Sequence, residues 1–186
     1  RSRSRLAPVW RSRSLVVEGD AAAAVFLSPR EVTLGDGHRP VLLGIADEVA
    51  YFMADVSHLG ESDAASLGGQ NSRFVDLRNV GAQIDGQQGA LLAYARGLAF
   101  WHSRHMFCGV CGAPNIATEA GHVRHCTNAE CGTDHYPRID PAVIMLATHG
   151  DKCLLARNGR NTDVPMYSTL AGYVEPGESL EEPVAR

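Results

Sequence analysis

Residues 107–137 read FCGVCGAPNIATEAGHVRHCTNAECGTDHYP and carry four of the chain's five cysteines in two closely spaced pairs. Cys108 and Cys111 form the first pair, and Cys126 and Cys131 form the second. Two turns that each present two thiolates can enclose a tetrahedral zinc ion with protein ligands alone. The stretch is poor in aliphatic residues and cannot bury much core, so it needs another source of stability. We therefore predict a structural zinc site with no open coordination position.

Other interpretations of these cysteines are open at the level of sequence. Redox-active thiols or inert buried cysteines fit the same composition, whereas disulfides do not suit a chain without an export signal. His105, His122, His125 and His135 lie nearby and could each replace a ligand. With four cysteines at hand, we expect these histidines to be surface residues or partners of the ligands.

Upstream of these cysteines the sequence predicts a β-rich domain followed by one helix. Residues 14–55 hold apolar blocks separated by Gly, Asp and Pro, which is typical of a meander of short strands. A Gly-rich stretch at 60–72 indicates a loop, and 74–78 a further short strand or strand end. From 87 to 105, apolar residues recur at spacings of three and four and predict a helix. The apolar blocks of the meander are 15–17, 25–27, 41–43 and 51–53.

Downstream of the cysteines the sequence predicts a hairpin. Residues 142–147 indicate a buried strand, 149–151 a turn, and 152–157 the returning strand. Cys153 lies in this returning strand, and we expect a small core residue there rather than a nucleophile.

Composition limits the class of protein. With 45% hydrophobic and 20% charged residues, the chain is globular, and its net charge of -4 does not indicate a nucleic-acid binder. Five arginines fall within the first thirteen residues; they could steer a polyanion, but we expect a mobile, solvated terminus. No apolar run suits a membrane span and no secretory signal is present, so we expect a cytoplasmic protein. The absence of an initiating Met and the end within a helical pattern indicate a processed or truncated product.

Residues 170–186, LAGYVEPGESLEEPVAR, carry the main functional signal. Gly172 and Gly177 allow a strand to bend sharply into a loop, and Ser179 with Glu182 forms a capping box that starts a helix. Carboxylates at such a junction can hold Mg²⁺ or Mn²⁺ and so orient water toward a diphosphate. A solvated, capped helix without metal fits the same residues.

The spacing within this stretch resembles the first part of the Nudix box. Gly172, five residues, Glu178, seven residues and Arg186 match its first fifteen positions, and the remaining glutamate-bearing part is absent from this sequence. Together with the cysteine pairs, this makes residues 76–186 similar to the NADH pyrophosphatase branch of the Nudix hydrolases, the NudC-like enzymes. The other matching segments are WH at 101–102, FCG at 107–109 and YPRIDP at 136–141.

This resemblance implies the fold and the activity. The fold is α+β, with a β-rich N-terminal domain (1–85), a linking helix (86–106), a four-cysteine zinc ribbon (107–137) and the start of a Nudix α/β/α sandwich (138–186). Members of the family are homodimers whose active sites draw on both subunits. They hydrolyse NAD(H) to nicotinamide mononucleotide and AMP with Mg²⁺ or Mn²⁺, and bacterial relatives remove NAD caps from RNA.

The same resemblance suggests roles for individual residues. Ala171 matches the position whose backbone carbonyl binds Mg²⁺ or Mn²⁺, and Tyr136 matches an aromatic residue that stacks on a substrate ring. Arg78 matches a substrate-contacting arginine, and Tyr173 stands beside the base; a strand-end salt bridge and a packed aromatic are equal alternatives for these two. Glu178 is the candidate catalytic glutamate, although without the others it serves mainly as a loop carboxylate and an outer partner of metal or arginine.

Departures from the family pattern limit these expectations. Because the remaining glutamates and the downstream nicotinamide signature are missing, we expect residues 1–186 alone to lack turnover. Pro183 follows Ser179 within one turn and is expected to remove an amide and loosen the helix. The alternatives are a Nudix hydrolase of ADP-ribose or a sugar nucleotide, a non-catalytic zinc-ribbon module that binds RNA, and an inactive or regulatory dimer.

Overall fold

The chain divides into two compact units, Arg1–Pro137 and Arg138–Arg186. The computed structural model describes residues 3–17, 19, 22–157 and 166–186. None of the helices within these residues has the length and apolar character that a bilayer crossing requires.

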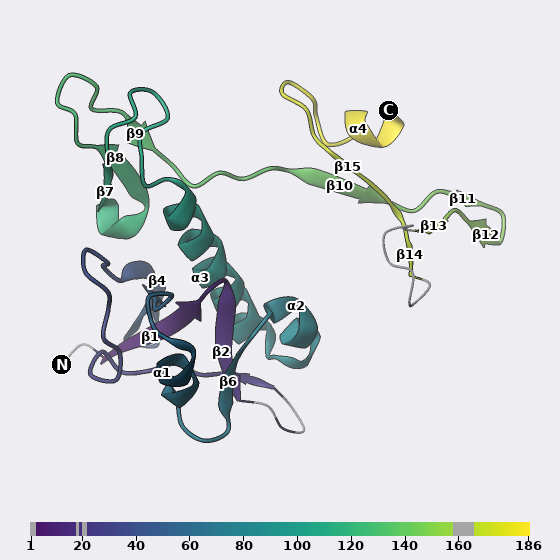
Figure 1. The fold of residues 1–186 in the computed structure, drawn as a ribbon. Helices are drawn as coiled ribbons and strands as arrows, with labels where there is room; N and C mark the ends of the chain where they lie inside the picture. The colour runs from purple at the N-terminus through teal and green to yellow at the C-terminus, as the bar shows by residue number, and fades with distance from the viewer. Residues whose placement is uncertain (1–2, 18, 20–21, 158–165) are drawn as a thin grey trace. The chain divides into compact units, whose positions relative to one another are not determined.

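A mixed six-stranded sheet forms the base of the first unit (Figure 1). Its strands run in the order β3-β2-β1-β5-β4, and β6 also pairs with β2. β1 lies between β2 and β5 in the middle of the sheet, antiparallel to β2 and parallel to β5. The strands are β1 (Arg3–Trp10), β2 (Arg13–Val17), β3 (Ala23–Ala24), β4 (Val41–Ala46), β5 (Val49–Asp55) and β6 (Ser72–Val75).

The N-terminal segment is a central strand, and the prediction of a mobile terminus was wrong. The side chains from Leu6 to Trp10 are all buried, and both edges of β1 are paired. The arginines stand at the ends of this apolar run: the guanidiniums of Arg11 and Arg13 lie 4.6 Å and 5.9 Å from the Trp10 ring centroid. Their charge stays near solvent while their stems cover the indole.

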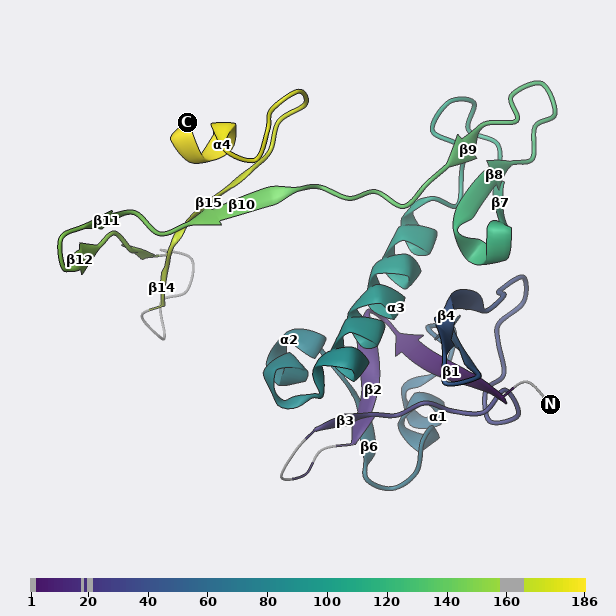
Figure 2. The same ribbon diagram turned by 180° about the vertical axis from the view of Figure 1, so that it is seen from behind.

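Helix α3 (Gly86–Arg104) agrees with the predicted helix to within one residue at each end. The Asp85 side chain accepts hydrogen bonds from the amides of Gln87 and Gln88, which is the pattern of an N-cap. Its buried face packs against the sheet, and Figure 2 shows the helix lying across the strands. That face consists of Leu92, Ala95, Leu98, Ala99 and Trp101.

Three short segments of the first unit differ from the prediction. The loop at 60–72 contains helix α1 (Glu61–Ser66), whose buried Ala64 packs with Trp10. The expected strand at 74–78 is divided, because the Asp76 side chain caps a new helix α2 (Leu77–Val80), followed by the 3₁₀ turn η1 (Gly81–Gln83). The block at 25–27 forms no strand; Leu27 makes a single bridge to Leu6.

The cysteine-bearing segment folds as a small three-stranded antiparallel sheet in the order β7-β8-β9. Val123 is its one buried aliphatic side chain. The prediction that this segment has little core of its own is therefore confirmed. Its elements are β7 (Asn115–Thr118), η2 (Glu119–Gly121), β8 (Val123–Cys126) and β9 (Asp134–His135).

The second unit is built from short antiparallel pairs. The expected strand at 142–147 is β10 (Ala142–Met145), but its partner is β15 (Leu170–Tyr173), and Ile144 is 75% exposed. The expected returning strand is broken, because its first part pairs with β11 and its last part with β14. Cys153 is exposed, so its assignment to a core was wrong. The remaining elements are β11 (Thr148–His149), β12 (Lys152–Cys153), β13 (Ala156–Arg157), β14 (Tyr167–Ser168) and α4 (Glu182–Ala185).

The predicted α+β class, with its β-rich N-terminal region, is confirmed. Sheets dominate the described residues, and α3 is the one long helix among them.

Candidate metal centre and functional loops

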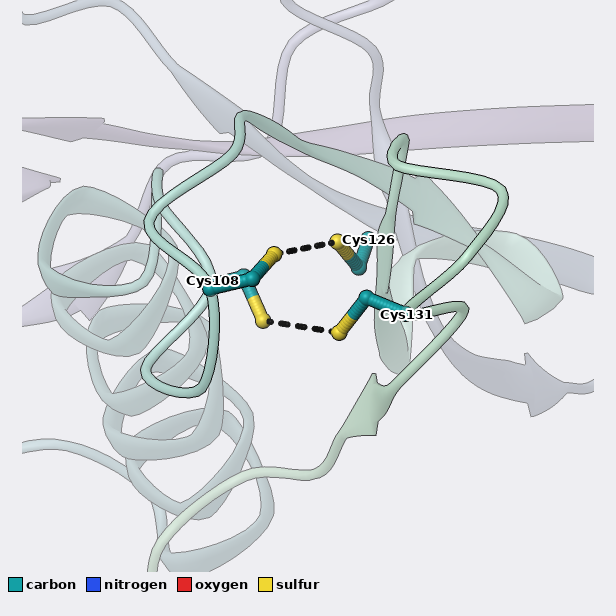
Figure 3. Close-up of side chains that lie close together, drawn as sticks. Cys108, Cys126 and Cys131 are labelled. Atoms are coloured by element: carbon teal, nitrogen blue, oxygen red, sulfur yellow. Dashed lines mark hydrogen bonds between the residues drawn. The ribbon is translucent and has the colours of Figure 1, made fainter.

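Four thiols converge in the small sheet. The sulfur atoms of Cys108, Cys111, Cys126 and Cys131 all lie within 4.8 Å of one another, and three of these residues are labelled in Figure 3. The Sγ atoms of Cys108 and Cys131 are 3.8 Å apart, and those of Cys111 and Cys126 are 3.4 Å apart. Zn–S bonds of about 2.3 Å in a tetrahedron place the sulfurs about 3.8 Å apart. The cluster therefore fits a zinc ion closed off by four thiolates.

Each cysteine pair is held in a tight turn by backbone hydrogen bonds. In the first turn the Cys108 amide donates to Ala113 O, and the Gly112 amide donates to Cys108 O. In the second turn the amides of Cys131 and Gly132 both donate to Asn128 O. Gly112 and Gly132 have φ values of 78° and 54°, which L side chains rarely adopt. The turns are thus shaped by the chain itself and present their thiols ready for metal.

The four nearby histidines are not ligands in this arrangement. His105 bonds to Trp101 O, His122 to Leu42 O, and His125 to Asp134 Oδ1. His135 Nε2 lies 3.3 Å from Cys108 Sγ, which places it as a hydrogen-bond partner of a ligand sulfur. A second partner is the hydroxyl of Thr133, 3.1 Å from Cys131 Sγ.

These surroundings push the thiol pKa values apart. The Thr133 hydroxyl lowers the pKa of Cys131, and a backbone amide lowers that of Cys108. Burial raises the pKa of Cys126. Four neighbouring thiolates repel one another unless a cation lies between them, so the cluster has the chemistry of a structural metal site.

The cysteine sheet is attached to the large sheet through η2 and β4. His122 Nε2 lies 2.6 Å from Leu42 O, and the His122 Nδ1 atom lies 3.3 Å from the Tyr94 hydroxyl. Next to it, the Gly121 carbonyl accepts a hydrogen bond from His102 Nε2 at 2.7 Å. A Cβ on Gly121 would lie 2.5 Å from Val41 Cγ2, so glycine is needed for this close approach.

In the second unit, Glu178 and Arg186 form an ion pair that closes the loop after β15. Arg186 Nε donates to Glu178 Oε1, and Nη2 donates to Oε2, both at 3.0 Å. The Glu175 amide also donates to Glu178 Oε2, at 2.8 Å. The Arg186 guanidinium therefore holds the pKa of Glu178 below its ordinary value. Glu178 therefore stabilises the loop by binding both Arg186 and the Glu175 amide.

Two sequence expectations for this loop need correction. Gly177 takes a φ of 92°, as a sharp turn requires, but Gly172 lies in β15 without a positive φ. Ser179 is not the N-cap; its amide donates to Glu182 Oε2, and α4 begins after Glu181. Pro183 therefore lies within the first turn, where an amide has no partner inside the helix, and it removes no helical hydrogen bond.

The candidate substrate residues are divided between the units. Ala171 and Tyr173 lie on β15, and the Tyr173 carbonyl accepts from Arg186 Nη2 at 3.3 Å. Arg78 lies on α2, where its Nη2 donates to Asp76 Oδ2 at 2.6 Å. Tyr136 follows β9 and is 66% exposed. Figure 1 shows α2 and β9 at opposite ends of α3.

A cavity of about 620 Å³ in the first unit was not predicted from the sequence. It is lined by the loop at 36–39, strands of both sheets and the end of α3. Its polar side chains, which include His102 and Arg124, come from separate elements and form no motif along the chain.

Two family models match the chain. The model described as "NADH pyrophosphatase-like rudimentary NUDIX domain" matches residues 3–101, and that described as "NADH pyrophosphatase zinc ribbon domain" matches residues 103–136. The second match and the sulfur geometry agree, so the cysteine sheet is a zinc ribbon and its metal is structural zinc.

Named relatives are similar to this chain over part of their length. "NAD-capped RNA hydrolase NudC" of Stutzerimonas stutzeri is 47% identical over 115 residues, covering 62% of this chain and 41% of the relative. "Nudix hydrolase 19, chloroplastic" of Arabidopsis thaliana is 38% identical over 151 residues, covering 76% and 34%. "NAD-capped RNA hydrolase NUDT12" of Homo sapiens is 39% identical over 112 residues, covering 56% and 24%. The chain thus spans less than half the length of these relatives.

Proposed function

Because this chain belongs to the NADH pyrophosphatase-like Nudix family, we propose that the protein hydrolyses the diphosphate bond of NAD(H) to nicotinamide mononucleotide and AMP. The observation that carries this proposal is the four-thiol zinc ribbon, since it follows a Nudix-like domain that matches the same family. Removal of NAD caps from RNA belongs to the same proposal, because two of the relatives are named as NAD-capped RNA hydrolases.

Among the residues that the structure describes, no group of carboxylates has the spacing of a Mg²⁺ or Mn²⁺ site. Within the part of the chain that the structure describes, the cysteine cluster is the one group of His, Cys, Asp or Glu with ligand spacing. Both oxygens of Glu178 are engaged by Arg186 and by the loop amide. We therefore place the catalytic Mg²⁺ or Mn²⁺ in the whole protein and propose that residues 1–186 by themselves lack turnover.

Within that scheme the described residues bind and orient substrate. Tyr136 and Tyr173 are 66% and 71% exposed, so each offers a free ring face on which a nicotinamide or adenine can stack. Arg78 donates to Asp76 from both Nε and Nη2, so a contact with phosphate would use its Nη1 or displace the carboxylate. Ala171 lies in β15, whose pairing with β10 orients its carbonyl, and the Glu178–Arg186 pair closes the loop that follows this strand.

The activity is tested with the full-length, zinc-loaded protein and Mn²⁺. NADH is incubated beside ADP-ribose and a sugar nucleotide, and the products are separated by chromatography. We expect reduced nicotinamide mononucleotide and AMP in equal amounts, and a higher kcat/KM for NADH. Intact NADH beside efficient cleavage of ADP-ribose or the sugar nucleotide would overturn the substrate. Salt-sensitive RNA binding without any metal-dependent hydrolysis would favour the non-catalytic zinc-ribbon module.

Two tyrosine variants test the binding roles. We expect Tyr136→Ala and Tyr173→Ala to raise KM for NADH by about tenfold, as for loss of one stacking contact. Tyr167→Ala is the matched control, since Tyr167 is 61% exposed but lies on β14. An unchanged KM in either test variant would remove that residue from the binding site.

Three further parts of the proposal concern organisation. We propose functional divisions at 1–85, 86–106, 107–137 and 138–186, a homodimer, and a cytoplasmic location. Light scattering on the full-length protein tests the homodimer, and a monomer at micromolar concentration would refute it.

A further inference from the structure

The cavity of the first unit has the volume of a small-molecule site. It measures about 620 Å³, within the range of about 300–1,000 Å³ in which proteins bind small organic ligands. The larger apolar side chains of its lining are Val41, Met53, Met106 and Ile116. The other lining side chains are mostly polar or charged, so the space suits a ligand with both an apolar part and a charged part.

Arg124, on β8, is a half-buried cation without a carboxylate partner. Its Nε donates to His105 O at 3.0 Å, and no carboxylate of the described residues forms an ion pair with it. Uncompensated guanidinium at a cavity wall is a site for an anion.

A second unpaired group lies beside it. Asn115 is 7% exposed and lines the same cavity; its Nδ2 donates to His105 O, but its Oδ1 has no partner among the described residues. Buried polar atoms are usually satisfied. Arg124 Nε and Asn115 Nδ2 thus both donate to the His105 carbonyl. The terminal nitrogens of the Arg124 guanidinium and the Oδ1 atom of Asn115 are left to bind a ligand.

The rim carries charge of both signs. Arg39 and His38 come from the exposed loop at 36–39, and His102 from the end of α3. Asp36 and Asp55 also line the cavity, and one oxygen of Asp55 accepts from the Ser57 amide. These side chains do not form a group with metal-ligand spacing. The carboxylates can accept hydrogen bonds from hydroxyl or amino groups, while the guanidiniums bind the anion.

We propose that this cavity binds a small phosphomonoester, of which a nucleoside monophosphate is the representative, with its phosphate on Arg124 and Arg39. A phosphate dianion matches two guanidiniums better than a single carboxylate does. In such a complex the carboxylates of Asp36 and Asp55 would accept hydrogen bonds from the ribose hydroxyls, and the apolar lining side chains would contact the base. The site lies wholly in the first unit and is independent of the loop at 170–186.

Calorimetric titration of the zinc-loaded chain at constant ionic strength tests this proposal with AMP, adenosine and inorganic phosphate. We expect AMP to bind and adenosine not to bind. Phosphate weaker than AMP identifies an organic phosphomonoester as the ligand, whereas phosphate equal to AMP identifies free phosphate. Adenosine binding as tightly as AMP, or no binding of AMP or phosphate at millimolar concentration, overturns the proposal.

Variants locate the site. We expect Arg39→Ala and Arg124→Lys each to weaken AMP binding by about tenfold or more, as for loss of a charge-assisted hydrogen bond. Arg104→Ala is the control for Arg39→Ala: it removes the same charge, but Arg104 lies on α3 and does not line the cavity. Zinc content and tryptophan fluorescence establish that each variant is folded, and Arg39, on an exposed loop, is the safer of the two. Unchanged AMP affinity in folded Arg39→Ala and Arg124→Lys overturns the proposed location.

Discussion

Gly121→Ala is expected to destabilise the first unit, because the ribbon meets the large sheet at this glycine. The added Cβ would lie 2.5 Å, 2.7 Å and 2.9 Å from Cγ2, Cγ1 and Cβ of Val41. Overpacking of this kind costs about 1–3 kcal/mol. The φ of 96° adds about 1–3 kcal/mol for a residue other than glycine. We therefore expect a loss of about 2–6 kcal/mol, a large part of the stability of an ordinary domain.

Urea unfolding followed by tryptophan fluorescence measures this loss. Both tryptophans, Trp10 and Trp101, are buried in the first unit, so the signal reports that unit. Gly97→Ala is the matched control: Gly97 lies within α3 with nothing near its missing Cβ, and alanine there should stabilise by about 1 kcal/mol. In Gly121→Ala with Val41→Ala both Cγ contacts are removed and only the 2.9 Å contact with the Cβ of residue 41 is left, so the steric part should become smaller while the φ part remains. A loss below about 1 kcal/mol in Gly121→Ala would refute the close contact.

Three other predictions follow from the same structure. Chelation of zinc should remove amide-exchange protection from residues 107–136 while the large sheet keeps its protection, because Val123 is the ribbon's one buried aliphatic side chain. Retained protection in residues 107–136 would show that the ribbon does not need zinc to stay folded. Arg186→Gln should raise the pKa of Glu178 toward 4.5 in an NMR titration, because the variant removes the guanidinium that lowers it. In the unchanged protein the ion pair stabilises the loop above pH 4.5, and this stabilisation is lost as the pH falls through the lowered pKa. An unchanged pKa in the variant would contradict the ion pair. Burial lowers the pKa of His102 below 6.5, so the unfolded state binds a proton at a higher pH than the folded state does. Stability should thus decline as pH falls below 6.5, and an NMR midpoint for His102 at or above 6.5 would be inconsistent with burial.

The elements with a strong local signal were predicted from sequence. Helix α3 has a sustained spacing of three and four, and the zinc ribbon has paired cysteines whose chemistry admits few arrangements. In both cases the residues that decide the structure are close together in the chain. The Nudix-like identity followed because a ribbon and a partial box occur side by side.

Elements whose structure depends on distant partners were not predicted. Because of the arginines around β1, a mobile terminus was predicted there. The apolar run between these arginines forms a central strand only by pairing with β5, about forty residues later. Pro183 was judged against a helix start at Ser179, but the helix begins at Glu182. The cavity combines residues such as His38 and Arg124 that no local pattern connects.

The central place of β1 has a consequence for synthesis. During synthesis β1 can pair on one side with β2 at once, but its other side waits for β5, and β2 in turn waits for β6. A nascent chain therefore carries an exposed strand edge until about residue 75 has emerged, and such edges favour association with other chains. The arginines flanking β1 give this part of the nascent chain a positive charge, and repulsion between such charges opposes association before the sheet is complete.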